Sequence, residues 1–222
     1  MNWLRQWLAP GGVVVDSGAN IGQTVAYFGP LLGVRVFAFE PFAEASEWLN
    51  QCLAQQTGWH VEVVSAGLHD VSGSLQLLIP DFAWQIGAQA TLQRGWYGDR
   101  VKRYVTIPVL RLDEFLEERK VDRLRLWKLD VEGWEVHALT GARAALGRHA
   151  IDAVYVEVGQ DHLSRVREIA DSTRYAIFKL DQQGRLVLQR GALEGVMNLI
   201  MLPAHSRESL AAMQNDDSPK RE

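Results

Sequence analysis

The ten residues from Val13 to Gly22, which read Val-Val-Val-Asp-Ser-Gly-Ala-Asn-Ile-Gly, constrain the fold of this chain more than any other stretch. Three consecutive β-branched residues favour a short buried strand that ends near Asp16. Gly18 and Gly22 then enclose a turn, and a helix is expected from about Ile21 to Leu32. A strand, a glycine-containing loop and a helix in this order present free backbone N–H groups to a ligand.

The acidic side chain of Asp16 indicates which ligand this loop would take. A carboxylate repels a phosphate group, whereas it can bind hydroxyls or a cationic amine. The run also departs from the Gly-x-Gly-x-x-Gly pattern of dinucleotide sites, because Asn20 replaces the central glycine that admits a pyrophosphate. We therefore favour S-adenosylmethionine over NAD as the cofactor. The Asn20 side chain could cap the helix start or bond a ligand carboxylate.

Strands and helices alternate along the chain, which predicts an α/β fold with right-handed crossovers and a parallel sheet. The expected helices cover residues 43–56, 112–120, 136–146 and 162–171. The expected strands beyond Val13–Val15 are Val34–Phe39, Val61–Ser65, Ser74–Ile79, Tyr104–Val109, Leu124–Asp130, Ala153–Val158, Tyr175–Leu180 and Met197–Leu202.

Composition narrows the functional class. The chain has 222 residues, 47% of them hydrophobic, and this length suits one substantial domain. Its net charge of −4 gives no electrostatic case for binding nucleic acid or anionic membranes. No apolar run approaches the roughly 20 residues of a membrane span. The single cysteine, Cys52, excludes an intramolecular disulfide and fits a cytoplasmic location.

Acidic residues stand at or near the ends of four expected strands: Asp16, Glu40, Asp130 and Glu157. In an open parallel sheet the carboxyl ends of the strands form the edge at which ligands bind. Glu40 follows Asp16 by 24 residues, close to the spacing at which an acid on the second strand meets a bound ribose. The four acids therefore predict a binding site at this edge.

Four segments together resemble the FkbM family of S-adenosylmethionine-dependent methyltransferases. They are Asp16-Ser-Gly-Ala-Asn-Ile-Gly22, Phe39-Glu-Pro41, Leu112-Asp113 and Lys128-Leu-Asp-Val-Glu-Gly-Trp-Glu135. The resemblance covers about residues 13–159. It implies a Rossmann-like class I methyltransferase sheet, mostly parallel with an antiparallel last strand, in three layers. It also implies O-methylation of hydroxyls on sugars, glycans or natural products.

We expect a single methyltransferase domain over residues 1–206, with a short N-terminal helix in which Trp3, Leu4, Trp7 and Leu8 share one face. A loop insertion is expected at 80–103 and a disordered tail at 207–222. Within the insertion, the stretch Trp84–Tyr97 is a candidate lid over the acceptor, although its tryptophans could equally cover a sheet edge. The expected partner is a small-molecule or glycan acceptor, and a homodimer is possible.

The resemblance also implies roles for the cofactor-binding residues. Asp16 and the Gly18–Gly22 loop, including Asn20 and Gly22, should contact the methionine part of the cofactor. Glu40 should accept hydrogen bonds from both ribose hydroxyls. Adenine should be flanked by residues that follow the third strand, namely Ser65, Ala66 and Leu68.

Methyl transfer to a hydroxyl needs alignment of the two reactants and a base for the hydroxyl proton. Asp130 is the best candidate base, and Lys128, two residues earlier on the same strand face, could tune its charge or orient the substrate. Glu132 is a further catalytic candidate, while Glu132 and Glu135 could also simply cap the next helix.

Three alternatives stay open. Asp130, Glu132 and Glu157 could hold Mg²⁺, which would lower the pKa of a substrate hydroxyl, although no metal site is assigned. His69 and His162 could act as bases, but a lone histidine in a turn is more often structural. A non-catalytic cofactor-binding or interaction protein on the same fold is the alternative function; a nucleotide-dependent oxidoreductase is disfavoured by Asp16 and Asn20.

Overall fold

The computed structural model describes residues 4, 7–8, 11–80, 101–193, 198–206, 209 and 211. The predicted lid at 84–97 lies outside these residues. So does the predicted tail at 207–222, apart from Ser209 and Ala211. Within the described part of the chain, every helix is too short or too polar to cross a bilayer.

An eight-stranded sheet forms the centre of the molecule, in the order β10-β9-β11-β8-β7-β1-β2-β3. The five neighbouring strands β3, β2, β1, β7 and β8 run parallel to one another. Strand β11 is antiparallel to both β8 and β9. The strands are β1 (Gly12–Ser17), β2 (Val34–Phe39), β3 (His60–Val64), β7 (Leu126–Leu129), β8 (Val154–Glu157), β9 (Tyr175–Leu180), β10 (Leu186–Leu188) and β11 (Asn198–Pro203). The prediction of a mostly parallel sheet with an antiparallel last strand is confirmed.

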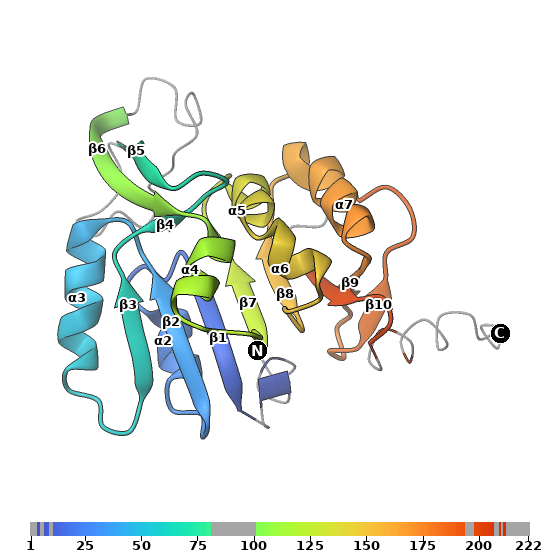
Figure 1. Cartoon of the computed structure of the whole chain (residues 1–222), viewed down its shortest axis with the longest axis horizontal. Coiled ribbons are helices and arrows are strands. Elements are labelled where there is room, and N and C mark those ends of the chain that lie inside the picture. Colours follow the sequence, from blue (N-terminus) through green and yellow to red (C-terminus); the bar gives the residue numbers. More distant parts are fainter. Residues whose placement is uncertain are drawn as a thin grey trace.

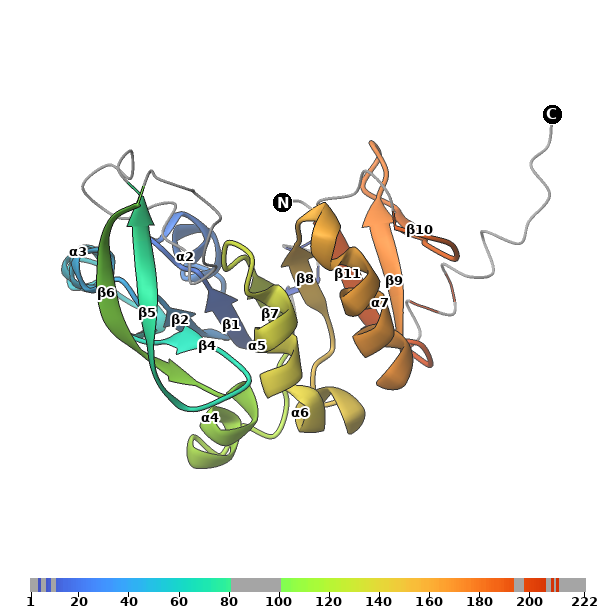
Figure 2. The same ribbon diagram turned by 90° about the horizontal axis from the view of Figure 1, so that it is seen from above.

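Helices cover both faces of this sheet, so the predicted three layers are present (Figures 1 and 2). The helices of one face are α4 (Leu112–Glu118), α5 (Glu135–Gly141), α6 (Arg143–Gly147) and α7 (Leu163–Ser172), the last preceded by the 3₁₀ turn η2 (Gln160–His162). The other face carries α2 (Gln23–Phe28), α3 (Ala43–Leu53) and the helical residues Leu4, Trp7 and Leu8.

The alternation of side chains along β1 explains why three valines open it. Val15 packs into the core beneath α4–α7, and Val14 packs into the core on the opposite face. Both side chains are fully buried. A parallel strand buried on two faces has no polar side, so a continuous apolar run is what this position requires.

A second, three-stranded sheet was not predicted. It has the order β4-β6-β5 and consists of β4 (Gly67–Leu68), β5 (Gly73–Pro80) and β6 (Val101–Leu110). Leu77 and Ile107 of this sheet pack with Phe42 at the start of α3. The segments 74–79 and 104–109 were correctly predicted as strands, but they extend further. The described ends of the predicted loop at 80–103 are strand, because Pro80 ends β5 and residues 101–103 begin β6.

Two helix predictions and the strand count need correction. The first helix ends at Phe28 rather than Leu32, because Pro30, which follows Gly29, has no backbone N–H to continue the helical hydrogen bonds. The expected helix at 136–146 is two helices separated at Ala142. The short strand β10 pairs with β9 and was missed, since its three half-buried residues give no periodic pattern.

Candidate functional site

The four predicted acids lie at the carboxyl ends of four neighbouring strands. Asp16 is the second-to-last residue of β1, Glu40 and Asp130 follow β2 and β7 directly, and Glu157 ends β8. The strand order reverses between β1 and β7, since β2 and β3 continue on one side and β8 on the other. Such a reversal point is where open α/β sheets bind ligands.

Lys128 lies between the carboxylates of Asp16 and Asp130, at the ends of the neighbouring strands β1 and β7. It pairs in register with Asp16 across β1 and β7. Its Nζ lies 3.5 Å from Asp16 Oδ1 and 3.2 Å from Asp130 Oδ2. Burial disfavours the charged ammonium, but the two carboxylates outweigh this effect and raise the pKa of Lys128. The lysine is therefore a fixed cation between two carboxylates.

Asp16 is fully buried, and burial raises the pKa of its carboxyl although Lys128 opposes the shift. Beyond the ion pair with Lys128, neither of its oxygens has a hydrogen-bond donor among the described residues. The same holds for the buried Oδ1 of Asn20 in the adjacent loop. Buried acceptors without donors are costly unless a ligand supplies the donors. Ammonium and hydroxyl groups would do so, which fits the amine and ribose of S-adenosylmethionine.

Glu40 ties the first loop to the second strand. Its Oε2 accepts a hydrogen bond from the Asn20 backbone N–H at 2.8 Å, and its Oε1 accepts one from the Phe42 N–H at 2.9 Å. Burial raises the pKa of Glu40 to about 7 despite these two bonds. A carboxylate has about four acceptor positions, so two bonds leave capacity for further donors.

The loop between β1 and α2 depends on its two glycines. Gly18 and Gly22 both have left-handed φ angles, of +76° and +89°. A Cβ at residue 18 would lie 1.9 Å from the Asp130 carbonyl oxygen, and one at residue 22 would lie 2.4 Å from Leu49 Cδ1. The backbone therefore takes a path that no other residue type allows without displacement. Asn20 has a positive φ as well, and its side chain makes no cap bond to α2.

The three residues expected near adenine follow β3 but differ in exposure. Ser65 is exposed, and its hydroxyl donates to the Ser46 hydroxyl at 3.1 Å. Ala66 is buried, and its N–H donates to the Val64 carbonyl. Leu68 lies in β4, and its side chain packs into the core beneath α4–α7. Ser65 is thus the member of this group with a side chain open to a ligand.

A second group of acids surrounds Asp130. Glu132 is partly buried, and burial together with the nearby carboxylates of Asp130, Glu135 and Glu157 raises its pKa to about 7. Burial and Asp130 also raise the pKa of Glu157. The Oε1 of Glu135 accepts hydrogen bonds from the Val131 and Gly133 N–H groups. Both N–H groups lie in the loop before α5, and Glu135 itself stands in the first turn of that helix, where a carboxylate is favourable.

The three acids considered for Mg²⁺, Asp130, Glu132 and Glu157, do not form a compact group of ligand atoms. Among the described residues, the group close enough to share an ion is His69, Asp70 and His137. Its two imidazole rings stack with an interplanar angle of 14°. Because the nitrogen lone pairs lie in these nearly parallel planes, the two rings cannot both direct a nitrogen at one ion. Asp70 instead accepts from His69 Nδ1 at 2.6 Å and from His137 Nδ1 at 2.9 Å.

This histidine cluster supports the structural interpretation of His69. The ring is buried and also contacts Trp134, which in turn lies 4.3 Å from the His137 ring. The roles of His137 and Trp134 were missed, since no sequence signal connects them with a histidine nearly seventy positions earlier. His162 Nδ1 lies 3.8 Å from Glu135 Oε2, which is beyond hydrogen-bond distance.

Comparison with known proteins places the chain in a family. The methyltransferase FkbM domain matches residues 16–186. Solved structures similar to the chain include an rRNA methylase from Streptococcus thermophilus (13% identity, 90% of both chains covered, TM-score 0.48) and a precorrin-6y C5,15-methyltransferase from Geobacter metallireducens (12% identity, 90% of this chain and 85% of that chain covered, TM-score 0.48). Both TM-scores are below 0.5.

No curated protein gives a significant match. The FkbM match, however, spans well over half of the sequence and contains the four acids at the strand ends described above. The motifs that suggested this family, from Asp16 to Glu135, all lie within the matched residues. The chain therefore belongs to the FkbM methyltransferase family and is an S-adenosylmethionine-dependent methyltransferase.

Proposed function

We propose that this methyltransferase transfers a methyl group to a hydroxyl of a sugar, glycan or natural-product small molecule. The observation that carries the proposal is the arrangement Asp16–Lys128–Asp130 at the point where the strand order reverses. Asp16 is fully enclosed, whereas the Asp130 side chain is 34% exposed. One carboxylate is thus suited to a bound cofactor and the other to an incoming acceptor.

The cofactor supplies a methyl group on a positively charged sulfur. We assign the amine of its methionine part to Asp16 and the backbone of the loop with Gly18, Asn20 and Gly22. Glu40 would accept bonds from the ribose hydroxyls with the capacity that its two backbone donors leave. For adenine we propose the segment after β3, with the Ser65 hydroxyl as its polar contact and the backbone of Ala66 and Leu68 beside it.

Asp130 would take the proton of the acceptor hydroxyl, which makes that oxygen a better nucleophile. Lys128, 3.2 Å from Asp130 Oδ2, holds the carboxylate in its orientation. Glu132, with a pKa of about 7, could exchange a proton with the acceptor in the same pH range. In-line displacement needs little more than this base, alignment and exclusion of water.

The acidic lining favours a hydroxyl-rich acceptor over a polyanion. Besides burial, the carboxylates of Asp130 and Glu157 raise the pKa of Glu132, and the carboxylate of Asp130 raises the pKa of Glu157. Such a surface repels phosphodiesters and attracts hydroxyl and amino groups. A small molecule or glycan is therefore the proposed acceptor, and RNA is not. A homodimer, a cytoplasmic location and a single domain over residues 1–206 stay predictions.

Thermal shift measurements test cofactor binding. S-adenosylhomocysteine should raise the melting temperature of the wild-type protein, and Glu40→Ala should abolish this shift. Asp130→Asn should keep the shift, because Asp130 is placed at the acceptor. An unchanged melting temperature with saturating S-adenosylhomocysteine would contradict the proposed cofactor site.

Release of S-adenosylhomocysteine in the presence of hydroxylated acceptors tests the reaction. Asp130→Asn should lower the turnover by about 10²–10⁴-fold, the range that general-base catalysis contributes. Equal turnover by the Asp130→Asn variant and the wild type would refute the assignment of the base. Transfer to an RNA oligonucleotide but to no sugar or small-molecule hydroxyl would refute the acceptor class.

A further inference from the structure

A cavity of about 430 Å³ lies away from the site just described. Side chains that line it include Arg123, Arg125, Arg148, His149, Asp152 and His205. None of these residues has a place in the proposed methyl transfer. Binding sites for small molecules have volumes of roughly 300–1,000 Å³, so the cavity is large enough for a small organic ligand.

The topology puts this cavity at the amino edge of the sheet. Arg123 and Arg125 precede β7, and Asp152 precedes β8. Because β11 is antiparallel to β8, its last residue, Pro203, reaches the same edge. His205 follows two residues later. The predicted cofactor and acceptor residues stand at the opposite, carboxyl ends of the same strands, so the two sites are separate.

Positive charge exceeds negative charge in the cavity. Asp152 is the acid of its lining, and it is already bound by two arginines. Arg123 Nε lies 2.6 Å from its Oδ1, and Arg125 Nη1 lies 3.1 Å from its Oδ2. Three guanidinium groups thus face one carboxylate, which leaves an excess of two positive charges without counting either histidine.

The Arg125 and His149 side chains are held in place, so the cavity is preorganised. Arg125 stacks over the Trp7 ring at 4.3 Å, and its Nε donates to the Trp7 carbonyl. The His149 Nε2 lies 3.0 Å from the Thr173 carbonyl oxygen, and its ring lies 4.6 Å from the His205 ring. Preorganised donors lose little freedom when a ligand binds.

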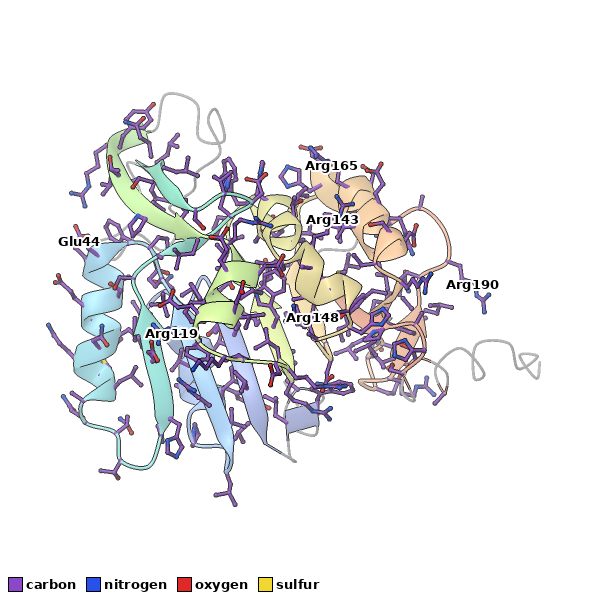
Figure 3. The ribbon with its side chains drawn as sticks, in the orientation of Figure 1. Glu44, Arg119, Arg143, Arg148, Arg165 and Arg190 are labelled. Carbon is purple, nitrogen blue, oxygen red and sulfur yellow. The ribbon has the colours of Figure 1, made fainter. Side chains whose placement is uncertain are left out.

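Arg148 differs from the other two arginines. Its side chain is exposed at the end of α6, and its guanidinium makes no ion pair or hydrogen bond with any residue in the described part of the chain. It therefore has all of its donors available to a ligand in the cavity. Figure 3 labels Arg148 beside α6, and Arg165 on α7.

We propose that this cavity binds the phosphoryl group of a small organic phosphate. Guanidinium groups match the oxygens of a phosphate in geometry and charge. The donors come from several directions, with Arg123 before β7, Arg148 after α6 and His205 after β11. This suits a tetrahedral dianion better than a planar carboxylate. The remaining volume admits the organic part of the ligand.

Isothermal titration with inorganic pyrophosphate at constant ionic strength tests the proposal. We expect saturable binding to the wild type and about tenfold weaker binding to Arg148→Ala, as expected for the loss of one charge-assisted bond. Arg165→Ala is the matched control, because Arg165 is also exposed but does not line the cavity. His205→Ala should weaken binding too. Saturating S-adenosylhomocysteine should leave the affinity unchanged.

Each contrary outcome identifies a different error. Competition between pyrophosphate and S-adenosylhomocysteine would place the anion in the cofactor site and overturn the proposal. Equal weakening by Arg148→Ala and Arg165→Ala would show non-specific attraction. Tight binding of a single-stranded RNA oligonucleotide without saturable binding of pyrophosphate would mean that the cavity binds a nucleic acid and not a small phosphate. The proposal does not depend on the acceptor of methyl transfer.

Discussion

Gly18 and Asp130 are in such close contact that a Cβ atom at residue 18 would lie 1.9 Å from the Asp130 carbonyl oxygen. The two residues follow β1 and β7, the neighbouring strands between which the strand order reverses. The Asp130 N–H also donates to the Ser17 carbonyl at 3.2 Å. The loop proposed to bind the cofactor and the residue proposed to take the proton therefore form one rigid unit.

Gly18→Ala should test this unit. The added methyl group must displace the Asp130 carbonyl, and the φ of +76° is unfavourable for alanine. We expect a loss of about 2–4 kcal/mol in the free energy of unfolding, measured by chemical denaturation. Gly147→Ala is the control, since no atom lies within 4 Å of its ideal Cβ. Equal stability of the two variants would mean that the backbone around residue 18 and Asp130 moves apart at little cost.

The pKa of Glu40, about 7, predicts a pH-dependent affinity for S-adenosylhomocysteine. Ribose hydroxyls donate to a carboxylate, so binding favours the ionised form and lowers the pKa of Glu40 in the complex. Protons are then released on binding, and the affinity should rise as the pH increases from 5.5 to about 8. Calorimetry in two buffers of different ionisation enthalpy measures the number of protons released.

Two variants distinguish the source of this proton. Glu40→Gln should remove the pH dependence. Glu132→Gln should keep it, although the pKa of Glu132 is also about 7, because Glu132 is placed on the acceptor side. If only Glu132→Gln loses the pH dependence, the proton comes from Glu132, and Glu132 rather than Glu40 contacts the cofactor.

Asp70 should stabilise the fold through its two histidines. Burial opposes its ionisation, but His137 and His69 outweigh this effect and lower the pKa of Asp70. A carboxyl with a lowered pKa contributes stability above its unfolded value of 3.8, and this contribution is lost as the pH falls through the folded pKa. Asp70→Asn should cost about 1–2 kcal/mol at pH 7 in chemical denaturation, and less at pH 3.

Asp122→Asn provides the comparison for Asp70→Asn, because Asp122 is exposed. It should leave the free energy of unfolding unchanged at both pH values. If Asp70→Asn and Asp122→Asn are equally stable, the contacts of His69 and His137 with Asp70 contribute nothing measurable.

The sequence was most informative where local patterns decide the structure. Three valines followed by an acid and two glycines predicted β1 and its loop, and the acids predicted the edge at which the site lies. The register that places Lys128 opposite Asp16 could not be predicted. It depends on how β7 pairs with a strand more than a hundred residues earlier, and spacing along the chain does not determine that pairing.

Long-range packing explains the other differences as well. The small sheet of β4, β5 and β6 needs contacts between residues 67–80 and 101–110, whose strand patterns alone do not indicate a separate sheet. The interruption between α5 and α6 follows Gly141, where a Cβ would lie 2.0 Å from the His69 carbonyl. The arginines at the amino edge come from separate segments and form no motif in the sequence.

Removing Lys128 should lower the free energy of unfolding, because the buried Asp16 carboxylate then has no cation beside it. In Lys128→Met the nearest cation is lost, while Asp130 and Glu40 remain as negative neighbours of Asp16. Breaking a buried ion pair from one side costs about 3–5 kcal/mol. We therefore expect a loss of about 3 kcal/mol at pH 8 in chemical denaturation. Lys179→Met, at an exposed position on β9, should be neutral.

The sign of the pH dependence makes this test specific. Burial already raises the pKa of Asp16, and loss of Lys128 raises it further. A carboxyl whose folded pKa is raised contributes most below its unfolded pKa and loses stability as the pH rises through the folded value. The deficit of Lys128→Met should therefore shrink at pH 5. A deficit that is the same at pH 5 and pH 8 would indicate lost packing rather than an uncompensated charge.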